Sequence, residues 1–169
     1  MIIVSQANII KINTEAIISP TNGLFINNKG ASNDIFIAAG KITKNEIKKY
    51  KEKHKSLIEG DFYKTSGGKL IKNGVKIIYH TAINIAPNSN TSIYTINSAM
   101  NKILEDATKN KLESITFTGL GTGCCCLNKE IVAANMVSNA QKYCGLLNIN
   151  LIDIDDKMIK AFNKYLFKD

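Results

Sequence analysis

The sequence contains no arginine, because all 22 of its basic residues are lysine. Together with 14 acidic residues, these lysines give a formal net charge of +8, which favours weak attraction to polyanions. Arginine grips phosphate with two parallel hydrogen bonds from a planar fork. A phosphate site in this chain must therefore use backbone amides, hydroxyl groups or lysine.

The sequence also lacks a long uninterrupted apolar segment. One of the longest apolar stretches, Ile115 to Leu127, is broken by glycine and threonine, whereas a membrane-spanning helix needs about 18 consecutive apolar residues. The first residues, Met1 to Ser5, lack the basic and apolar regions of a secretory signal peptide. We therefore expect no membrane association and a cytoplasmic location.

Cysteine is scarce and clustered, since three of the four cysteines are consecutive, Cys124 to Cys126. Neighbouring residues cannot supply a framework of long-loop disulfides, so we expect reduced thiols. Three adjacent thiols also converge poorly on one metal ion, and no Cys-x-x-Cys pair or histidine cluster completes a set of four ligands. We expect neither a metal nor a cofactor.

Two interpretations of the cysteines remain open. A thiol near a helix N-terminus can have a lowered pKa and act as a nucleophile or redox sensor. Alternatively, small side chains are needed where the backbone meets a phosphate group. We favour the second interpretation, because a nucleophile needs a base and only His54 and His80 are available. We expect His54 to be solvated and His80 to lie in the core.

Short β-branched runs alternate with helical patterns along the chain. Strands are predicted at residues 1–4, 16–20, 62–66, 76–84, 114–118 and 150–154. Helices are predicted from a cap at Ser32 or Asn33 to Gly40, over residues 44–55 and 91–109, after an Asn128 cap, and after a cap at Asp155 or Asp156. Strands separated by helices indicate a mostly parallel sheet covered on both faces, in one domain spanning residues 1–169.

The strongest local signal is the strand and glycine-rich loop Ile115 to Gly123, followed by a capped helix. Such a loop leaves the carboxyl end of a strand, and its glycines let backbone N–H groups approach an anion. The pattern predicts a phosphate or pyrophosphate site. It departs from the Rossmann motif, because Cys124 replaces the last glycine, and from the P-loop, because Gly-Lys-Ser/Thr is missing. A glycine-rich turn without a ligand is the alternative for this motif alone.

Three spaced segments together resemble the macro domain family. Glu15 to Asn22 is an apolar strand ending in asparagine, and it precedes a loop with Gly23 and Gly30 and a helix ending in Ala-Ala-Gly40. Gly60 to Gly67 with Ile77 to Thr81 resembles the central hairpin of the family, and Gly121 to Leu127 resembles its second phosphate loop. The resemblance covers essentially the whole chain.

The resemblance implies a three-layer α/β/α sandwich with a mixed, mostly parallel sheet, and ADP-ribose as ligand. Asn8 stands where the family usually has an aspartate that bonds the adenine amino group, and Asn22 matches an asparagine near the distal ribose. Cys125 replaces an aromatic side chain, which implies a more open site. The implied ligand-binding residues are Asn8, Ile9, Asn22, Gly30, Ala31, Ser32, Gly121, Thr122, Gly123, Cys124 and Cys125.

Ser32 is the sharpest departure from the family pattern. Members that hydrolyse ADP-ribose from modified carboxylates typically carry an aspartate there, and serine is no base near neutral pH without an activating partner. Asp34 lies two residues further along a helix and should point about 200° away.

We therefore expect a module that binds ADP-ribose or ADP-ribosylated proteins. The alternative is a hydrolase that removes ADP-ribose from proteins or deacetylates O-acetyl-ADP-ribose, with Asn22 and the ligand's own phosphate holding water. A third, weaker interpretation is RNA or poly(ADP-ribose) binding through lysines.

Overall fold

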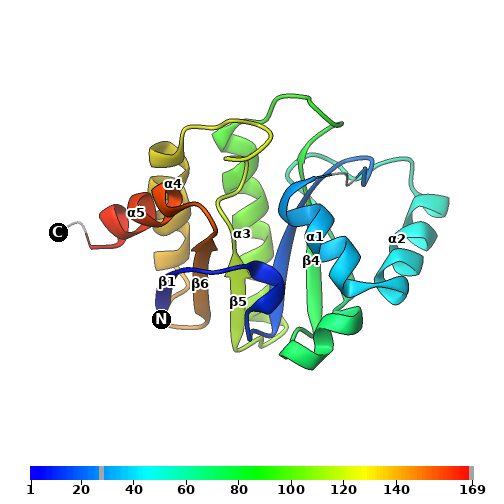
Figure 1. Cartoon of the computed structure of the whole chain (residues 1–169), viewed down its shortest axis with the longest axis horizontal. Coiled ribbons are helices and arrows are strands. Elements are labelled where there is room, and N and C mark those ends of the chain that lie inside the picture. Colours follow the sequence, from blue (N-terminus) through cyan, green and yellow to red (C-terminus); the bar gives the residue numbers. More distant parts are fainter. Residues whose placement is uncertain (27–28, 168–169) are drawn as a thin grey trace.

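A mixed sheet with the strand order β1-β6-β5-β2-β4-β3 organises the chain (Figure 1). The structure is a computed structural model that describes residues 1–26 and 29–167. Its strands are β1 (Ile2–Gln6), β2 (Ala16–Asn22), β3 (Phe62–Ser66), β4 (Ile77–Asn84), β5 (Ser114–Phe117) and β6 (Asn148–Asp153). All neighbouring pairs are parallel except the antiparallel hairpin of β3 and β4, which confirms the predicted central hairpin.

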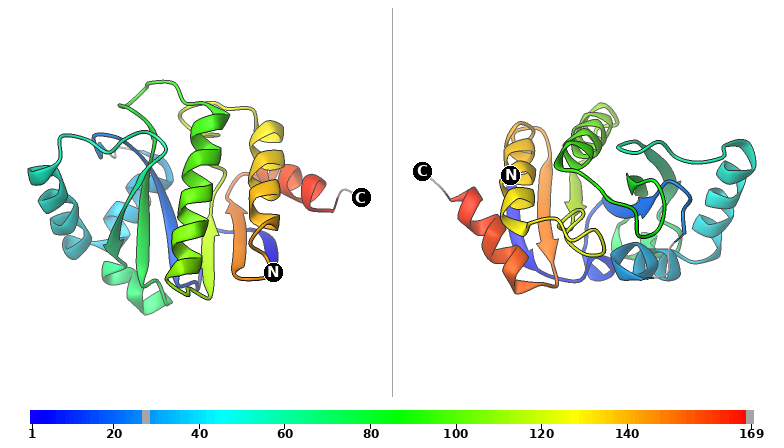
Figure 2. Two further views of the ribbon diagram at one scale, coloured as in Figure 1. Left: turned by 180° about the vertical axis from the view of Figure 1, so that it is seen from behind. Right: turned by 90° about the horizontal axis from the view of Figure 1, so that it is seen from above.

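Helices cover both faces of this sheet (Figure 2). On one side lie α3 (Ile93–Lys109) and α4 (Lys129–Gln141), and on the other lies α1 (Gly30–Ala39). The last helix, α5 (Asp156–Leu166), packs against α4 and the edge strand β1. The helix α2 (Lys41–Lys53) packs against the β3 edge. Two short 3₁₀ helices, η1 (Ile9–Lys11) and η2 (Gly68–Asn73), connect strands and helices. The expected α/β fold with a mixed, mostly parallel sheet is confirmed.

The core follows from the sequence pattern of the central strands. Ala16, Ile17 and Ile18 of β2 are fully buried, as expected for a strand covered on both faces. Ile17 packs in the cluster on the α1 side, whereas Ile18 packs with the apolar face of α3. Because consecutive strand residues point to opposite faces, this one strand anchors both helical layers.

Two of the predicted helix caps are confirmed, and the predicted cap of α1 is wrong. Asn128 and Asp155 cap α4 and α5 as expected, each side chain accepting a hydrogen bond from the first helical turn. Neither Ser32 nor Asn33 caps α1, because the helix already begins at Gly30 and its N-cap is Lys29. Gly30 adopts a φ of +72°, which lets the chain turn into the helix three or four residues earlier than predicted. Asn27 and Asn28, in the predicted loop before α1, lie outside the described residues.

The 3₁₀ helices were not predicted, because one or two turns give too little periodicity to detect. The pairs Gly67-Gly68 and Asn73-Gly74, which are typical of turns, form the two ends of η2. A Cβ at Gly68 would come within 2.2 Å of the Ala39 carbonyl oxygen, so this position needs glycine. η2 therefore packs closely under the end of α1.

His80 lies in the middle of β4 and is fully buried, which confirms the expected core position. Its Nε2 lies 2.9 Å from Thr65 Oγ1, and that hydroxyl donates to the Ser66 carbonyl, so the histidine nitrogen is the donor. The other ring nitrogen, Nδ1, has no partner among the described residues. Burial lowers the pKa of His80 to about 3.

This buried histidine makes stability depend on pH. The folded-state pKa lies below the unfolded value of about 6.5, so His80 contributes full stability above that value, and the contribution is lost as pH falls toward 3. Between pH 7 and pH 5 the free energy of unfolding should fall by about 2 kcal/mol from this residue. Urea unfolding of the wild type and His80→Gln at both pH values measures the difference.

His80→Gln should lower stability at pH 7 but flatten its pH dependence, whereas His54→Gln, at an exposed position, should leave the wild-type slope unchanged. An unchanged pH dependence in His80→Gln would show that the buried imidazole is not the responsible group.

Candidate functional site

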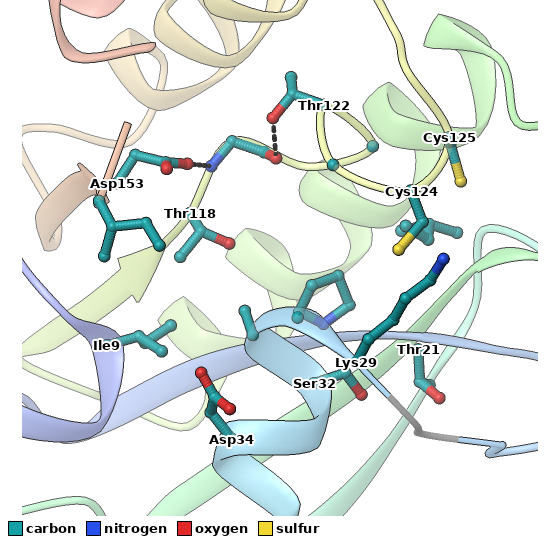
Figure 3. A pocket seen from close by; sticks show the side chains of 18 of the residues that line it. Ile9, Thr21, Lys29, Ser32, Asp34, Thr118, Thr122, Cys124, Cys125 and Asp153 are labelled. Carbon is teal, nitrogen blue, oxygen red and sulfur yellow. Dashed lines mark hydrogen bonds between the residues drawn. The ribbon is translucent and has the colours of Figure 1, made fainter. Parts of the chain in front are cut away.

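A pocket of about 390 Å³ opens where the parallel strands end (Figure 3). It is lined by the carboxyl ends of β2, β4 and β6, by the loop after β5, and by the first turn of α1. Ligands of open α/β sheets gather at this edge, because loops on both faces leave a crevice there. All eleven residues predicted to bind a ligand line this one pocket.

One end of the pocket is formed by η1 and the end of β6. Asn8 caps η1, and its side-chain oxygen accepts a hydrogen bond from the Ile10 amide at 3.1 Å. Ile9, buried, supplies an apolar wall. Asp153 also lines this end and was not predicted, although its place at the carboxyl end of the last strand was a usable signal.

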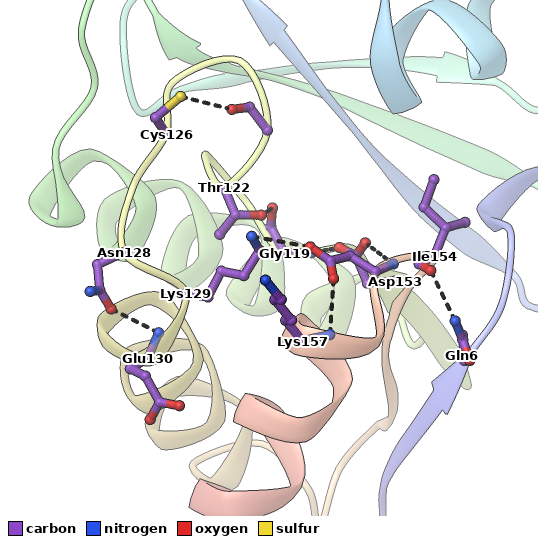
Figure 4. A network of polar contacts seen from close by, with 12 residues as sticks. Gln6, Gly119, Thr122, Cys126, Asn128, Lys129, Glu130, Asp153, Ile154 and Lys157 are labelled. Carbon is purple, nitrogen blue, oxygen red and sulfur yellow. Dashed lines mark hydrogen bonds and ion pairs between the residues drawn. The ribbon is translucent and has the colours of Figure 1, made fainter.

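Asp153 holds the β5–α4 loop (residues 118–128) in place (Figure 4). Its carboxylate accepts hydrogen bonds from the Gly119 amide at 3.1 Å and from the Asp155 amide at 2.9 Å. Asp155 in turn pairs with Lys129 at 3.1 Å, and the hydrogen bond from this lysine is the largest cause that lowers the pKa of Asp155. The starts of α4 and α5 are thereby tied together beside the pocket.

Asn22 organises the chain immediately after β2. Its side-chain oxygen accepts hydrogen bonds from the amides of Leu24, at 3.1 Å, and Ile26, at 3.2 Å, and its amide nitrogen donates to the Ile26 carbonyl at 2.8 Å. Both ends of this side chain are thus used to fold the connection toward α1. The geometry assigns Asn22 a positioning role in the structure as it stands.

The first turn of α1 borders the pocket through Gly30, Ala31 and Ser32. Ser32 is buried, and its hydroxyl oxygen accepts a hydrogen bond from Ser19 at 3.3 Å. The expectation that Asp34 points away from the site is wrong, because Asp34 also lines the pocket. The helix meets the pocket with its end, so residues around its circumference reach the cavity (Figure 3).

The β5–α4 loop owes its shape to Gly121 rather than Gly123. Gly121 has a φ of +75°, and a Cβ there would lie 2.9 Å from Leu127 Cδ1. The Thr122 hydroxyl closes the turn by donating to the Gly119 carbonyl at 2.8 Å. Gly123, by contrast, has no positive φ, and a Cβ there would meet nothing within 4 Å. Gly123 therefore leaves open space beside the loop, but its backbone conformation does not require glycine.

The cysteines face different directions within this loop. Cys124 and Cys125 line the pocket, whereas the Cys126 thiol donates to the Gly123 carbonyl at 3.5 Å. All four cysteines of the chain are free. The helix α4 begins only at Lys129, so no thiol caps it. Burial, and secondarily the adjacent thiols, raises the pKa of Cys125, which is the opposite of activation.

No group of three histidine, cysteine, aspartate or glutamate side chains in residues 1–26 and 29–167 is arranged to hold a metal ion. Within the same residues, no helix is both long and apolar enough to cross a membrane.

Alkylation should distinguish the three adjacent thiols. In proteins that keep only one of them, with serine at the other two positions, Cys125 should react several-fold more slowly with maleimide near neutral pH than exposed Cys124 or Cys126. Mass spectrometry after timed quenching measures the rates. Fastest labelling at Cys125 would restore the activated-thiol interpretation.

Comparison with known proteins places this chain. A protein of Aquifex aeolicus (strain VF5), described as uncharacterized, is 26% identical over 166 residues, which cover 96% of each chain. An Oceanobacillus iheyensis macrodomain with ADP superposes with a TM-score of 0.85 at 20% identity, over 96% of this chain and 88% of that one. A Trypanosoma brucei macrodomain in complex with ADP-ribose gives 0.79 at 18% identity, over 96% and 68%. The family model described as Macro domain matches residues 18–136, well over half of the chain, and the protein therefore belongs to the macro domain family.

Proposed function

We propose that residues 1–169 form a single macro domain that binds ADP-ribose, free or attached to a protein, in the pocket at the carboxyl ends of the strands. Structural neighbours from Oceanobacillus iheyensis and Trypanosoma brucei were solved with ADP or ADP-ribose. The observation that carries the proposal is that residues on two sides of the pocket have backbone N–H groups that no hydrogen bond within the described residues occupies.

The β5–α4 loop supplies the first set. No hydrogen bond within the described residues occupies the backbone N–H groups of Gly121, Gly123, Cys124 and Cys125, although these residues line the pocket. Successive free N–H groups in a turn form a concavity that favours anions. A diphosphate has enough acceptor oxygens to bind several of them at once.

The start of α1 supplies the second set. The first N–H groups of a helix have no partner inside the helix, and the aligned peptide dipoles place about half a positive charge there. Gly30 and Ala31 bring this end of α1 to the same pocket. A diphosphate held between the two would place adenine toward Asn8, Ile9 and Asp153. The distal ribose would then lie toward Asn22, Asn84 and Cys125.

The alternative function is hydrolysis of ADP-ribose from proteins or deacetylation of O-acetyl-ADP-ribose. Ser32 takes the place of a carboxylate base, and the Asn22 side chain is already engaged by Leu24 and Ile26. The feature that favours catalysis is Asp34, an exposed carboxylate on α1 that lines the pocket. Binding without efficient turnover agrees better with these side chains.

Binding of RNA or poly(ADP-ribose) through lysines lies outside the proposal. In the described part of the chain, seven lysines pair with carboxylates at different places on the surface. These pairs neutralise part of the positive charge where it occurs. The pocket, rather than a continuous basic surface, is the feature that a nucleotide ligand would recognise.

Substitutions at two glycines, one in the pocket and one outside it, test the proposed binding site. Gly123→Val should weaken ADP-ribose binding at least tenfold, about 1.4 kcal/mol, because the side chain would block the approach of phosphate to the loop amides. Gly145→Val is the matched control, since a Cβ at either position meets nothing within 4 Å and neither glycine has a positive φ. Calorimetric titration measures both affinities.

Both variants should keep the wild-type melting temperature within a few degrees. Loss of binding in Gly145→Val as well, or full binding in Gly123→Val, would place the ligand elsewhere.

A substitution at Ser32 tests the catalytic alternative. Ser32→Asp adds a carboxylate beside the first turn of α1, and general-base assistance of this kind is typically worth about 10² to 10⁴ in rate. Release of ADP-ribose from a glutamate-modified protein should rise from near zero to a measurable rate. Asn33→Asp is the control, because Asn33 does not line the pocket.

Rapid turnover by the wild type, with no gain from Ser32→Asp, would contradict the binding function. Loss of that turnover in Asp34→Asn would then assign the chemistry to Asp34.

A further inference from the structure

Lys29 stands at the entrance to α1 and lines the pocket. Its backbone is extended, with φ −162° and ψ 165°, and it serves as the N-cap without a side-chain hydrogen bond to the helix. The side chain extends from the start of α1 toward the β5–α4 loop that carries Cys124 (Figure 3). The ammonium group is therefore directed toward the loop that carries one of the two sets of unoccupied backbone N–H groups.

The other charged groups that line the pocket already have partners or lie apart. Lys129 pairs with Asp155, and Asp153 accepts two backbone hydrogen bonds. The Asp34 carboxylate lies on the far side of the first turn of α1 from the Lys29 ammonium (Figure 3). Within the part of the chain that the structure describes, Lys29 makes no ion pair, so its charge is available to a ligand.

We propose that Lys29 is a specificity-determining residue whose ammonium pairs with the phosphates of the bound nucleotide, and that it strengthens the binding of a ligand with a free terminal phosphate more than the binding of ADP-ribose. The proposal rests on the proposed nucleotide-binding function. Backbone amides recognise acceptor oxygens, whereas an ammonium adds a Coulomb attraction that grows with the charge of the ligand. Since the chain has no arginine, only lysine can supply this charge at neutral pH.

Ser32 reinforces the same preference. It is a neutral residue on the first turn of α1, so no carboxylate at this position compensates Lys29. ADP ends in a phosphate with up to two negative charges, whereas ADP-ribose ends in a neutral sugar. Lys29 should consequently strengthen ADP binding more than ADP-ribose binding, and it should leave adenosine unaffected.

A ligand series tests this inference by calorimetric titration. Lys29→Met should weaken ADP binding about fivefold or more, weaken ADP-ribose binding less, and leave adenosine binding unchanged. It should also reduce the dependence of ADP affinity on salt concentration. Lys29→Arg, which keeps the charge, should restore ADP binding. Lys48→Met is the control, because this exposed lysine of α2 lies outside the pocket and makes no ion pair among the described residues.

The outcomes separate the inference from the proposed function. Wild-type protein that binds neither ADP nor ADP-ribose at millimolar concentration would overturn both. Wild-type binding with equal ADP affinity in Lys29→Met would overturn the role of Lys29 alone. Equal losses for adenosine and ADP in Lys29→Met, without rescue by Lys29→Arg, would show that the residue only shapes the entrance to α1.

Discussion

The parallel pairing of β2 with both β4 and β5 determines where the pocket lies. Parallel strands must end at the same edge of a sheet, so the segments after these strands meet there although they are far apart in the sequence. Asn22 then folds the chain after β2, and Asp153 fixes the loop after β5 from the neighbouring strand. The placement of the backbone segments that line the pocket thus depends on sheet geometry rather than on any single side chain.

This arrangement suits a chain without arginine. Its pocket offers amides from a glycine-containing loop and from a helix start, and Lys29 adds one positive charge. Gly121 and Gly123 have separate roles in this loop. Gly121 permits the turn through its positive φ, and Gly123 leaves open space beside the backbone. The small thiol side chains of Cys124 and Cys125 agree with the same need for space, and the raised pKa of Cys125 argues against a nucleophile there.

Much of the fold could be predicted from the sequence, because β-branched runs and amphipathic spacing are local signals. Ser114 to Phe117, for example, is a β-branched run followed by glycine, and Asn128 is a recognisable cap. Other features depend on contacts that no local pattern contains. Asp153 matters because Gly119 lies beside it in space, and Lys29 belongs to the site because α1 begins three or four residues earlier than its apparent caps indicate. Asp34 was misplaced because helical spacing does not reveal that a helix meets the pocket with its end.

The central claim is that one ligand bridges the start of α1 and the β5–α4 loop. Titration of ¹⁵N-labelled protein with ADP-ribose, followed by amide chemical shifts, tests it most directly. The account predicts that the largest shifts fall in two groups, at Gly30 to Ser32 and at Gly121 to Cys125, and saturate together. Largest shifts along α2 or η2, or no shifts at millimolar ADP-ribose, would contradict it.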